Sequence, residues 1–201
     1  MRKNFESSER KEKLNLRPCV VVLSGTPLSG KTYLANELQK CLDIKVIDVD
    51  SVRHEIDETR RQDGQVKMLE PEQEKAIMIK SYTEMCRQAE EDALSGSPVL
   101  ITGTFSRAEF KKPLEELAKS LEKNNIPLRT FLLSITDEEA LKRIEKRKAE
   151  GSLSNIDSVE KFQWSKSIFS KFENIPFDKI DASTEKTIED VLEKISELII
   201  Q

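Results

Sequence analysis

The sequence has little of several residue types, and each shortage excludes a class of protein. Of its 201 residues, 6 are glycine, 3 are cysteine and 1 is histidine, and aromatic residues make up 5%. No apolar stretch approaches the roughly 20 residues that a membrane-spanning helix needs, so we expect no membrane partner. The first residues, 1–13, have neither an apolar core nor a small-residue cleavage site, which excludes a secretory signal.

The three cysteines, Cys19, Cys41 and Cys86, are scattered, and their spacing is not that of metal ligands. Two of them fall at predicted core positions, so we interpret them as buried thiols and expect a cytoplasmic location. The only histidine, His54, has no paired Ser or Cys motif, which favours a surface or supporting role.

Length and charge limit the organisation and the partners. The chain is long enough for one well-packed α/β domain with a small insert. We expect a flexible tail at 1–17 and a single domain at 18–201, with a lid at about 148–160 where a polar stretch interrupts two predicted helices. A plain surface turn is equally compatible with the composition of that stretch. A net charge of -4 and a pI near 5.4 argue against extended duplex binding. The sequence leaves the oligomeric state open.

An eight-residue motif with the spacing G-x-x-x-x-G-K-[ST] follows the apolar run 19–24. Glycines let the backbone bend closely around phosphate oxygens, and the helix that follows directs its N–H groups at the anion. Lys31 would add positive charge near the β- and γ-phosphates, and the Thr32 hydroxyl would ligate Mg²⁺. An ordinary strand-to-helix turn is the alternative. The motif predicts nucleoside triphosphate binding at Gly25, Thr26, Pro27, Leu28, Ser29, Gly30, Lys31 and Thr32.

Short apolar runs alternate with helical patterns along the rest of the chain. Strands are predicted at 19–24, 44–48, 98–102, 127–133 and 177–181. Helices are predicted at 30–42, 51–58, 71–95, 106–124, 137–149, 157–172 and 185–199. The predicted fold class is therefore α/β: a three-layer P-loop NTPase fold with a five-stranded parallel sheet, helices on both faces and a small helical lid. Phe162, Trp164, Phe169 and Phe172 are interpreted as packing between the lid helix and the body.

The second predicted strand ends in two carboxylates, Asp48 and Asp50, at the sheet edge where open α/β folds bind ligands. If Asp50 begins the next helix, it is the N-cap, and Arg53 lies close to it three residues later. An Asp cap followed by Arg is also common without any function. Beside a phosphate loop, however, a carboxylate for a hydroxyl proton or for Mg²⁺ and an Arg for substrate are what phosphoryl transfer needs.

Four segments together resemble the zeta-toxin-like, AAA_33-type P-loop kinases. They are the phosphate loop with its preceding strand (21–32) and the segments 47–53, 98–105 and 140–147. That group includes polynucleotide 5′-hydroxyl kinases and lies near gluconate and shikimate kinases. The resemblance covers about residues 18–185, and its motifs are more specific for a kinase than for a substrate.

The resemblance implies roles for the residues that match its motifs. Asp50 would be the base or orienter of the attacking hydroxyl, and Arg53 would contact the substrate or its phosphate. Asp48 would be linked to the metal. With Lys31 and Arg143, Asp50 and Arg53 complete the implied catalytic set.

On the nucleotide side, the resemblance implies that Arg143 and Arg147 are lid arginines that cover the ATP phosphates and adenine. Their spacing places both on one helix face, where exposed arginines are otherwise commonly solvated charge. Ser183 lies in the segment 181–184, which resembles the adenine-contacting loop of the group. The same segment also fits a helix start with Ser183 or Thr184 as its cap.

One residue departs from the pattern of the group. Many relatives have an acidic residue after the third strand, where this chain has Thr102. The carboxylate that binds Mg²⁺ in Walker-B motifs is therefore missing at that position. Either Asp48 or Asp50 supplies the metal contact, or the protein binds nucleotide and catalyses poorly.

The predicted function is an ATP-dependent phosphotransferase with ATP and Mg²⁺ as cofactors. It would move the γ-phosphoryl group to a hydroxyl of a small molecule, a nucleotide sugar or a nucleic-acid 5′ end. A GTPase-type switch would need a guanine-reading Asn-Lys-x-Asp sequence, and none occurs. Thr102 leaves a non-catalytic or weakly catalytic nucleotide-binding module as the alternative.

Overall fold

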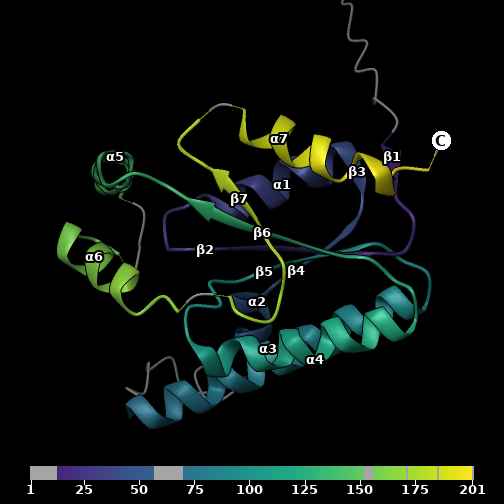
Figure 1. Ribbon diagram of the computed structural model, residues 1–201. Helices are drawn as coiled ribbons and strands as arrows, with labels where there is room; N and C mark the ends of the chain where they lie inside the picture. Colours follow the sequence, from purple (N-terminus) through teal and green to yellow (C-terminus); the bar gives the residue numbers. More distant parts are fainter. Residues whose placement is uncertain (1–12, 57–69, 152–155, 171, 185, 201) are drawn as a thin grey trace, which may run out of the picture.

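The centre of the molecule is a five-stranded parallel sheet in the order β4-β5-β2-β6-β7 (Figure 1). The computed structural model describes residues 13–56, 70–151, 156–170, 172–184 and 186–200. The strands are β2 (Val20–Gly25), β4 (Lys45–Asp48), β5 (Val99–Thr102), β6 (Leu128–Ser134) and β7 (Asp178–Asp181). Because each begins within one residue of its predicted start, the predicted five-stranded parallel sheet is confirmed.

Helices cover both faces of this sheet, which gives three layers. On one face lie α1 (Lys31–Cys41) and α7 (Thr187–Lys194), and on the other α2 (Val49–Ile56), α3 (Pro71–Leu94) and α4 (Ala108–Lys123) (Figure 1). Successive residues of β2 serve both cores, because Val21 and Leu23 join one cluster while Val20 and Val22 join the other. This double burial explains why the central strand is apolar throughout.

Two further helices lie beyond the carboxyl ends of the strands (Figure 1). They are α5 (Asp137–Ala149) and α6 (Val159–Ser167). Lys166 and Gln163 of α6 donate hydrogen bonds to the Asp137 carboxylate at 2.6 and 2.7 Å. The lid predicted at about 148–160 falls between these helices, and its residues 152–155 lie outside the described residues.

The helix predicted at 157–172 is shorter in the structure. It ends at Ser167, and the backbone N–H of Ser170 instead donates to the Ser106 carbonyl at 2.7 Å. The predicted packing of Trp164 is wrong, because this ring points away from the core and is 58% exposed. Phe162 and Phe172 are buried as predicted.

The ends of the described chain pack against each other, which corrects the predicted tail. The two-residue strand β1 (Leu14–Asn15) pairs in parallel with β3 (Leu42–Asp43), and the buried Leu16 bridges to Ile199. The buried Leu16 side chain and backbone hydrogen bonds therefore hold residues 14–17 on the domain, whereas 1–12 lie outside the described residues. The helix predicted at 185–199 is divided into α7 and a short 3₁₀ helix (Ser196–Leu198).

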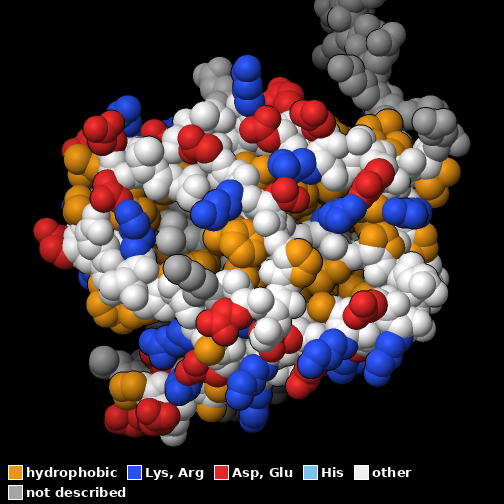
Figure 2. All heavy atoms as spheres, viewed as in Figure 1, with side chains coloured by type: hydrophobic (Ala, Val, Ile, Leu, Met, Phe, Trp, Pro, Cys, Tyr) orange, Lys and Arg blue, Asp and Glu red, His pale blue; other side chains and the backbone are white. Residues whose placement is uncertain are grey.

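The surface carries charges of both signs. Figure 2 shows Lys and Arg side chains interspersed with Asp and Glu on this face, with hydrophobic side chains between them. A face of this kind presents no single-sign field of the sort that grips a long polyanion. Across the described ranges, no helix is both long and apolar enough to cross a bilayer.

Candidate functional site

The predicted phosphate loop lies between β2 and α1, where its backbone turns sharply. Gly25 has no room for a side chain, because an added Cβ would lie 2.4 Å from the Leu133 carbonyl oxygen of the neighbouring strand. Leu28 and Gly30 both adopt left-handed conformations, with φ of 69° and 82°. Gly30 is the N-cap of α1 and offers no side-chain cap, so the first N–H groups of the helix have no intrahelical partner. Such a helix start favours an anion.

The ammonium of Lys31 lies inside this loop. It donates to the carbonyls of Gly25 and Thr26 at 3.0 and 2.9 Å and lies 3.4 Å from the Ser29 hydroxyl. Burial lowers the pKa of Lys31 to about 8, while the negative charges of Asp48 and Asp50 oppose the shift. A bound polyphosphate would replace this set of neutral acceptors with negative charge and restore the ammonium to its usual range.

Asp48 and Thr102 end adjacent strands and face each other in register. The Thr102 hydroxyl donates a hydrogen bond to one carboxylate oxygen of Asp48. The other oxygen accepts the backbone N–H of Asp50 at 2.9 Å. The expectation that Asp50 is the N-cap is therefore wrong: α2 begins at Val49, and Asp48 accepts the hydrogen bond at the helix start. A carboxylate therefore lies on the strand adjacent to Thr102, and the Thr102 hydroxyl is hydrogen-bonded to it.

The residues predicted to bind metal line a common cavity. Thr32 and Asp48 both face a space of about 450 Å³ between α1 and α2, together with Thr102 and Ser51. One hydroxyl and one carboxylate suit Mg²⁺, which keeps several waters and takes further oxygens from substrate phosphates. In the described part of the chain, no group of three or more His, Cys, Asp or Glu could hold a metal by itself. The donor set fits a cation shared with a nucleotide.

Asp50 and Arg53 lie one turn apart on α2, and the negative charge of Asp50 acts on Lys31. The Asp50 carboxylate is exposed and Arg53 is half-buried. Within the described residues, neither side chain is held by a hydrogen bond or an ion pair. Two opposite charges are thus left available beside the phosphate loop. His54, the next residue, is exposed.

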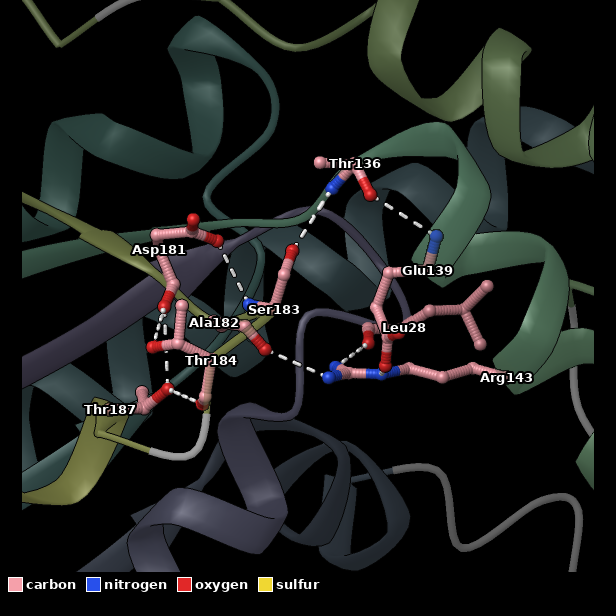
Figure 3. Close-up of polar contacts among 9 residues, drawn as sticks. All are labelled: Leu28, Thr136, Glu139, Arg143, Asp181, Ala182, Ser183, Thr184 and Thr187. Carbon is pink, nitrogen blue, oxygen red and sulfur yellow. Dashed lines mark hydrogen bonds and ion pairs between the residues drawn. The ribbon is translucent and has the colours of Figure 1, made fainter.

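Arg143 connects the phosphate loop to the segment that follows β7 (Figure 3). Its guanidinium donates to the Leu28 carbonyl of the phosphate loop and to the Ala182 carbonyl after β7, both at 2.8 Å. Glu139, one turn earlier on α5, orients it through a 2.7 Å ion pair. The Arg143 guanidinium is therefore held by protein carbonyls. Exposed arginines in a run of charged residues are more commonly solvated.

The cavity beside Arg143 has a volume of about 800 Å³. Its walls come from the phosphate loop, α1, β6, α5, the turn after β7 and α7, and they include Tyr33, Leu133, Arg147 and Ile188. Arg147 is exposed, but its charge reaches Lys31 and contributes to the lowered pKa of that ammonium. Charged side chains line the cavity together with these apolar ones, so it could take a ligand that carries both a ring and charged groups.

The segment 181–184 forms a tight turn next to this cavity (Figure 3). The Ser183 hydroxyl accepts the Thr136 N–H at 3.2 Å, and the Ser183 N–H donates to Asp181 Oδ1 at 2.9 Å. The N-cap of α7 is Lys186, so the alternative that Ser183 or Thr184 caps this helix is wrong. Ser183 lines the cavity, with its hydroxyl oxygen and its backbone N–H both hydrogen-bonded.

Several residues at or near the site were not identified from the sequence. Glu139 orients Arg143, and its spacing of four residues on a helix could have revealed it. Tyr33 lines the nucleoside-sized cavity although it is 65% exposed. Tyr82 is fully buried, and its hydroxyl oxygen lies 3.1 Å from the hydroxyl oxygen of Thr104. Such a contact between distant segments has no local pattern.

Comparison with known proteins gives one family and one fold. The family model AAA_33, described as an AAA domain, matches residues 20–169. A sugar kinase from Janibacter sp. is similar in structure at 17% identity and a TM-score of 0.63, covering 89% of this chain and 94% of that one. A gluconokinase from Sinorhizobium meliloti has 13% identity and a TM-score of 0.60, with 93% and 95% covered.

A shikimate kinase from Bacteroides thetaiotaomicron is similar at 16% identity and a TM-score of 0.55, with 90% of this chain and 97% of that one covered. No curated protein matches the sequence. At these identities the likeness concerns the fold, and it agrees with the predicted three-layer P-loop class.

Proposed function

The chain belongs to the AAA_33 family of AAA domains, as its resemblance to AAA_33-type P-loop kinases predicted, and from this premise we propose that it is an ATP-dependent phosphotransferase. It moves the γ-phosphoryl group to a hydroxyl of a small molecule, a nucleotide sugar or a nucleic-acid 5′ end. The titles of the similar structures, a sugar kinase, a gluconokinase and a shikimate kinase, support a small hydroxylated acceptor.

The observation that carries the proposal is the pair of carboxylates at the end of β4. Asp48 is fixed by Thr102 and by the Asp50 N–H, whereas the Asp50 carboxylate is exposed and unbonded to any described residue. Both charges act on Lys31. A fixed carboxylate beside a free one, next to a phosphate loop, supports catalysis better than binding alone.

The chemistry follows from these positions. The Asp50 carboxylate accepts the proton of the acceptor hydroxyl as the acceptor oxygen bonds to the γ-phosphorus. The bond from that phosphorus to the β,γ-bridging oxygen breaks, and the electron pair leaves with ADP. Lys31 and the N–H groups at the start of α1 stabilise the charge on the phosphates, and Arg53 orients the acceptor. Catalysis is mainly positioning and electrostatics.

Thr32 and Asp48 would hold Mg²⁺, which when bound neutralises charge on the β- and γ-phosphate oxygens. Thr102 keeps the Asp48 carboxylate in place for that contact. On the nucleoside side, the cavity beside Arg143 would take the base and ribose. Arg147 would approach the phosphates, since its charge already reaches Lys31.

The test is transfer of label from γ-labelled ATP to a panel of sugars, sugar acids, nucleosides and 5′-hydroxyl oligonucleotides. We expect transfer to one class of acceptor, which Asp50→Asn abolishes and His54→Gln, a change at an exposed residue of α2 outside the 450 Å³ cavity, preserves. Nucleotide binding without turnover on any acceptor, and a background ATP hydrolysis that Asp50→Asn does not change, would favour the non-catalytic module.

A further inference from the structure

One lysine outside the nucleotide site is buried. Lys111, near the start of α4, is only 4% exposed. Its ammonium donates hydrogen bonds to the carbonyl and hydroxyl oxygens of Ser170. It also lies 5.4 Å and 4.8 Å from the ring centroids of Phe169 and Phe172. Burying an ammonium is costly, so packing alone does not explain a lysine here.

Ser170 is held from its other side by the loop after β5. Its N–H and its hydroxyl both donate to the Ser106 carbonyl, at 2.7 and 3.2 Å. Ser170 therefore bridges Lys111 and Ser106. It fixes the chain three residues after α6 ends at Ser167.

The loop after β5 also contacts the strand that leads into the phosphate loop. The Thr104 carbonyl accepts the hydroxyl of Ser24 at 3.0 Å, and Ser24 directly precedes Gly25. Phe105 is buried and left-handed, with φ of 48°, and its N–H donates to the Tyr82 hydroxyl at 3.1 Å. A bulky residue keeps this conformation only where its surroundings enforce it. Residues 103–107 therefore form a loop whose conformation is fixed by its contacts with Ser24 and Tyr82.

The helix before Ser170 is connected to the nucleotide side. Lys166 and Gln163 of α6 bind Asp137 at the start of α5. Two turns further along α5, Arg143 binds the carbonyl oxygens that border the larger cavity. Contacts therefore run from that cavity through α5 and α6 to Ser170, and from Ser170 to Ser106 in the loop 103–107. Thr104 of this loop lies at hydrogen-bond distance from the Tyr82 hydroxyl, which feels the charge of Asp50.

We propose that Lys111 is a positioning residue that couples α6 to the loop 103–107, so that nucleotide binding is transmitted to the side that receives the acceptor hydroxyl. The inference rests on the proposed function, because it assumes a nucleotide in the cavity beside Arg143. Lysine suits this role, since its apolar stem can be buried while its ammonium makes several hydrogen bonds at the far end.

The experiment uses the single tryptophan of the chain, Trp164, as a reporter on α6. Emission of Trp164 and hydrogen exchange of residues 103–107 are measured with and without AMP-PNP and Mg²⁺. The variants are Lys111→Met, which keeps the apolar stem, and Lys111→Arg, which keeps a donor. The control is Lys112→Met at the exposed neighbour.

In the wild type we expect both signals to respond to the nucleotide. In Lys111→Met, Trp164 still responds, but the slowing of exchange at 103–107 shrinks at least about fivefold, the lower end of ordinary coupling free energies. Lys111→Arg restores the slowing and Lys112→Met leaves it unchanged. A purely structural lysine would alter exchange at 103–107 equally with and without nucleotide.

Equal slowing in Lys111→Met and in the wild type overturns the inference and leaves the proposed function intact. Absence of protection at 25–32 in every variant overturns the proposed function and the inference with it. If Lys111→Met does not fold, Ser170→Ala removes the bridging hydroxyl and is expected to weaken the coupling in the same direction. An unchanged coupling in that variant contradicts the inference.

Discussion

The two sides of the phosphate loop are built in different ways. On the nucleotide side, Arg143 joins the Leu28 and Ala182 carbonyls, Glu139 orients it, and hydrogen bonds hold the turn at 181–184 (Figure 3). On the acceptor side, Asp50 and Arg53 project from α2 without partners among the described residues. The first side is assembled before any ligand arrives.

This difference suggests which side binds the nucleotide and which side selects the second substrate. Preformed contacts lower the entropy lost when a common ligand binds, which suits a nucleotide used in every cycle. Unpaired charges gain their partners only from the second substrate, so they contribute where that substrate reacts. Asp48 lies at the boundary, fixed by Thr102 but facing the cavity that Thr32 also lines.

The largest expected effect comes from the acceptor side. Asp50→Asn should lower the transfer rate about 10²- to 10⁴-fold, the range for loss of a general base. The Michaelis constant for ATP should stay near its wild-type value, because we place Asp50 at the acceptor hydroxyl and not at the nucleotide. Steady-state kinetics check this, with Asp43→Asn, an exposed acid of β3, as the matched control. An unchanged rate would remove Asp50 from the chemistry.

On the nucleotide side, Arg143→Met should break the connection between the phosphate loop and the turn after β7. We expect nucleotide affinity to fall about tenfold to a hundredfold, as for the loss of one charge-assisted hydrogen bond. Equilibrium titration of ADP measures it, and Lys142→Met at the exposed neighbour serves as control. Equal affinities in Arg143→Met and the wild type would mean that the cavity does not need this connection.

At the boundary, Thr102→Val removes the donor that orients Asp48. We expect the concentration of Mg²⁺ needed for half-maximal activity to rise about tenfold, the lower end for residues that orient a metal ligand. Thr102→Ser keeps a hydroxyl and should behave as the wild type. A Mg²⁺ requirement that is the same in all three proteins would contradict the role given to Thr102.

The smallest effect is a pH dependence of stability that originates in Lys31. Burial lowers its pKa in the folded protein from 10.5 to about 8, so between these values the unfolded chain binds more protons. Stability therefore rises with pH across that window, relative to Lys31→Met, which cannot titrate there. Urea unfolding from pH 7 to 11 checks the sign, and a difference that falls or stays constant would contradict it.

Nucleotide affinity should move the other way with pH. As pH rises above about 8, free Lys31 loses its proton, and binding of a polyphosphate must restore it. The affinity of the wild type for ADP should weaken over that range, while the affinity of Lys31→Met should be flatter. Parallel pH profiles would show that another group governs the wild-type dependence.

The sequence predicted what depends on neighbours along the chain. The phosphate loop has a fixed spacing, and the five strands are apolar runs bounded by turn residues, so both were found. Arg143 was assigned to the nucleotide side on a resemblance, but its contacts to other segments are with backbone carbonyls, which no residue type reveals. The distance between these segments along the chain hides such contacts.

Other features depend on register or on burial and were missed. Thr102 supports Asp48 because β4 pairs with β5 in one register, and the two residues are 54 positions apart. The two-residue strand β1 is too short to show any periodicity, so Leu14 was placed in a tail. Trp164 fits a helical period on α6 but lies on its exposed face.

The most direct test of this division between the two sides is the affinity of Asp50→Asn for AMP-PNP with Mg²⁺, measured beside Arg143→Met. The account predicts that Asp50→Asn binds as tightly as the wild type or more tightly, since a negative charge near the phosphates is removed, while Arg143→Met binds more weakly. A loss of affinity in Asp50→Asn as large as that in Arg143→Met would contradict it, because Asp50 would then belong to the nucleotide site.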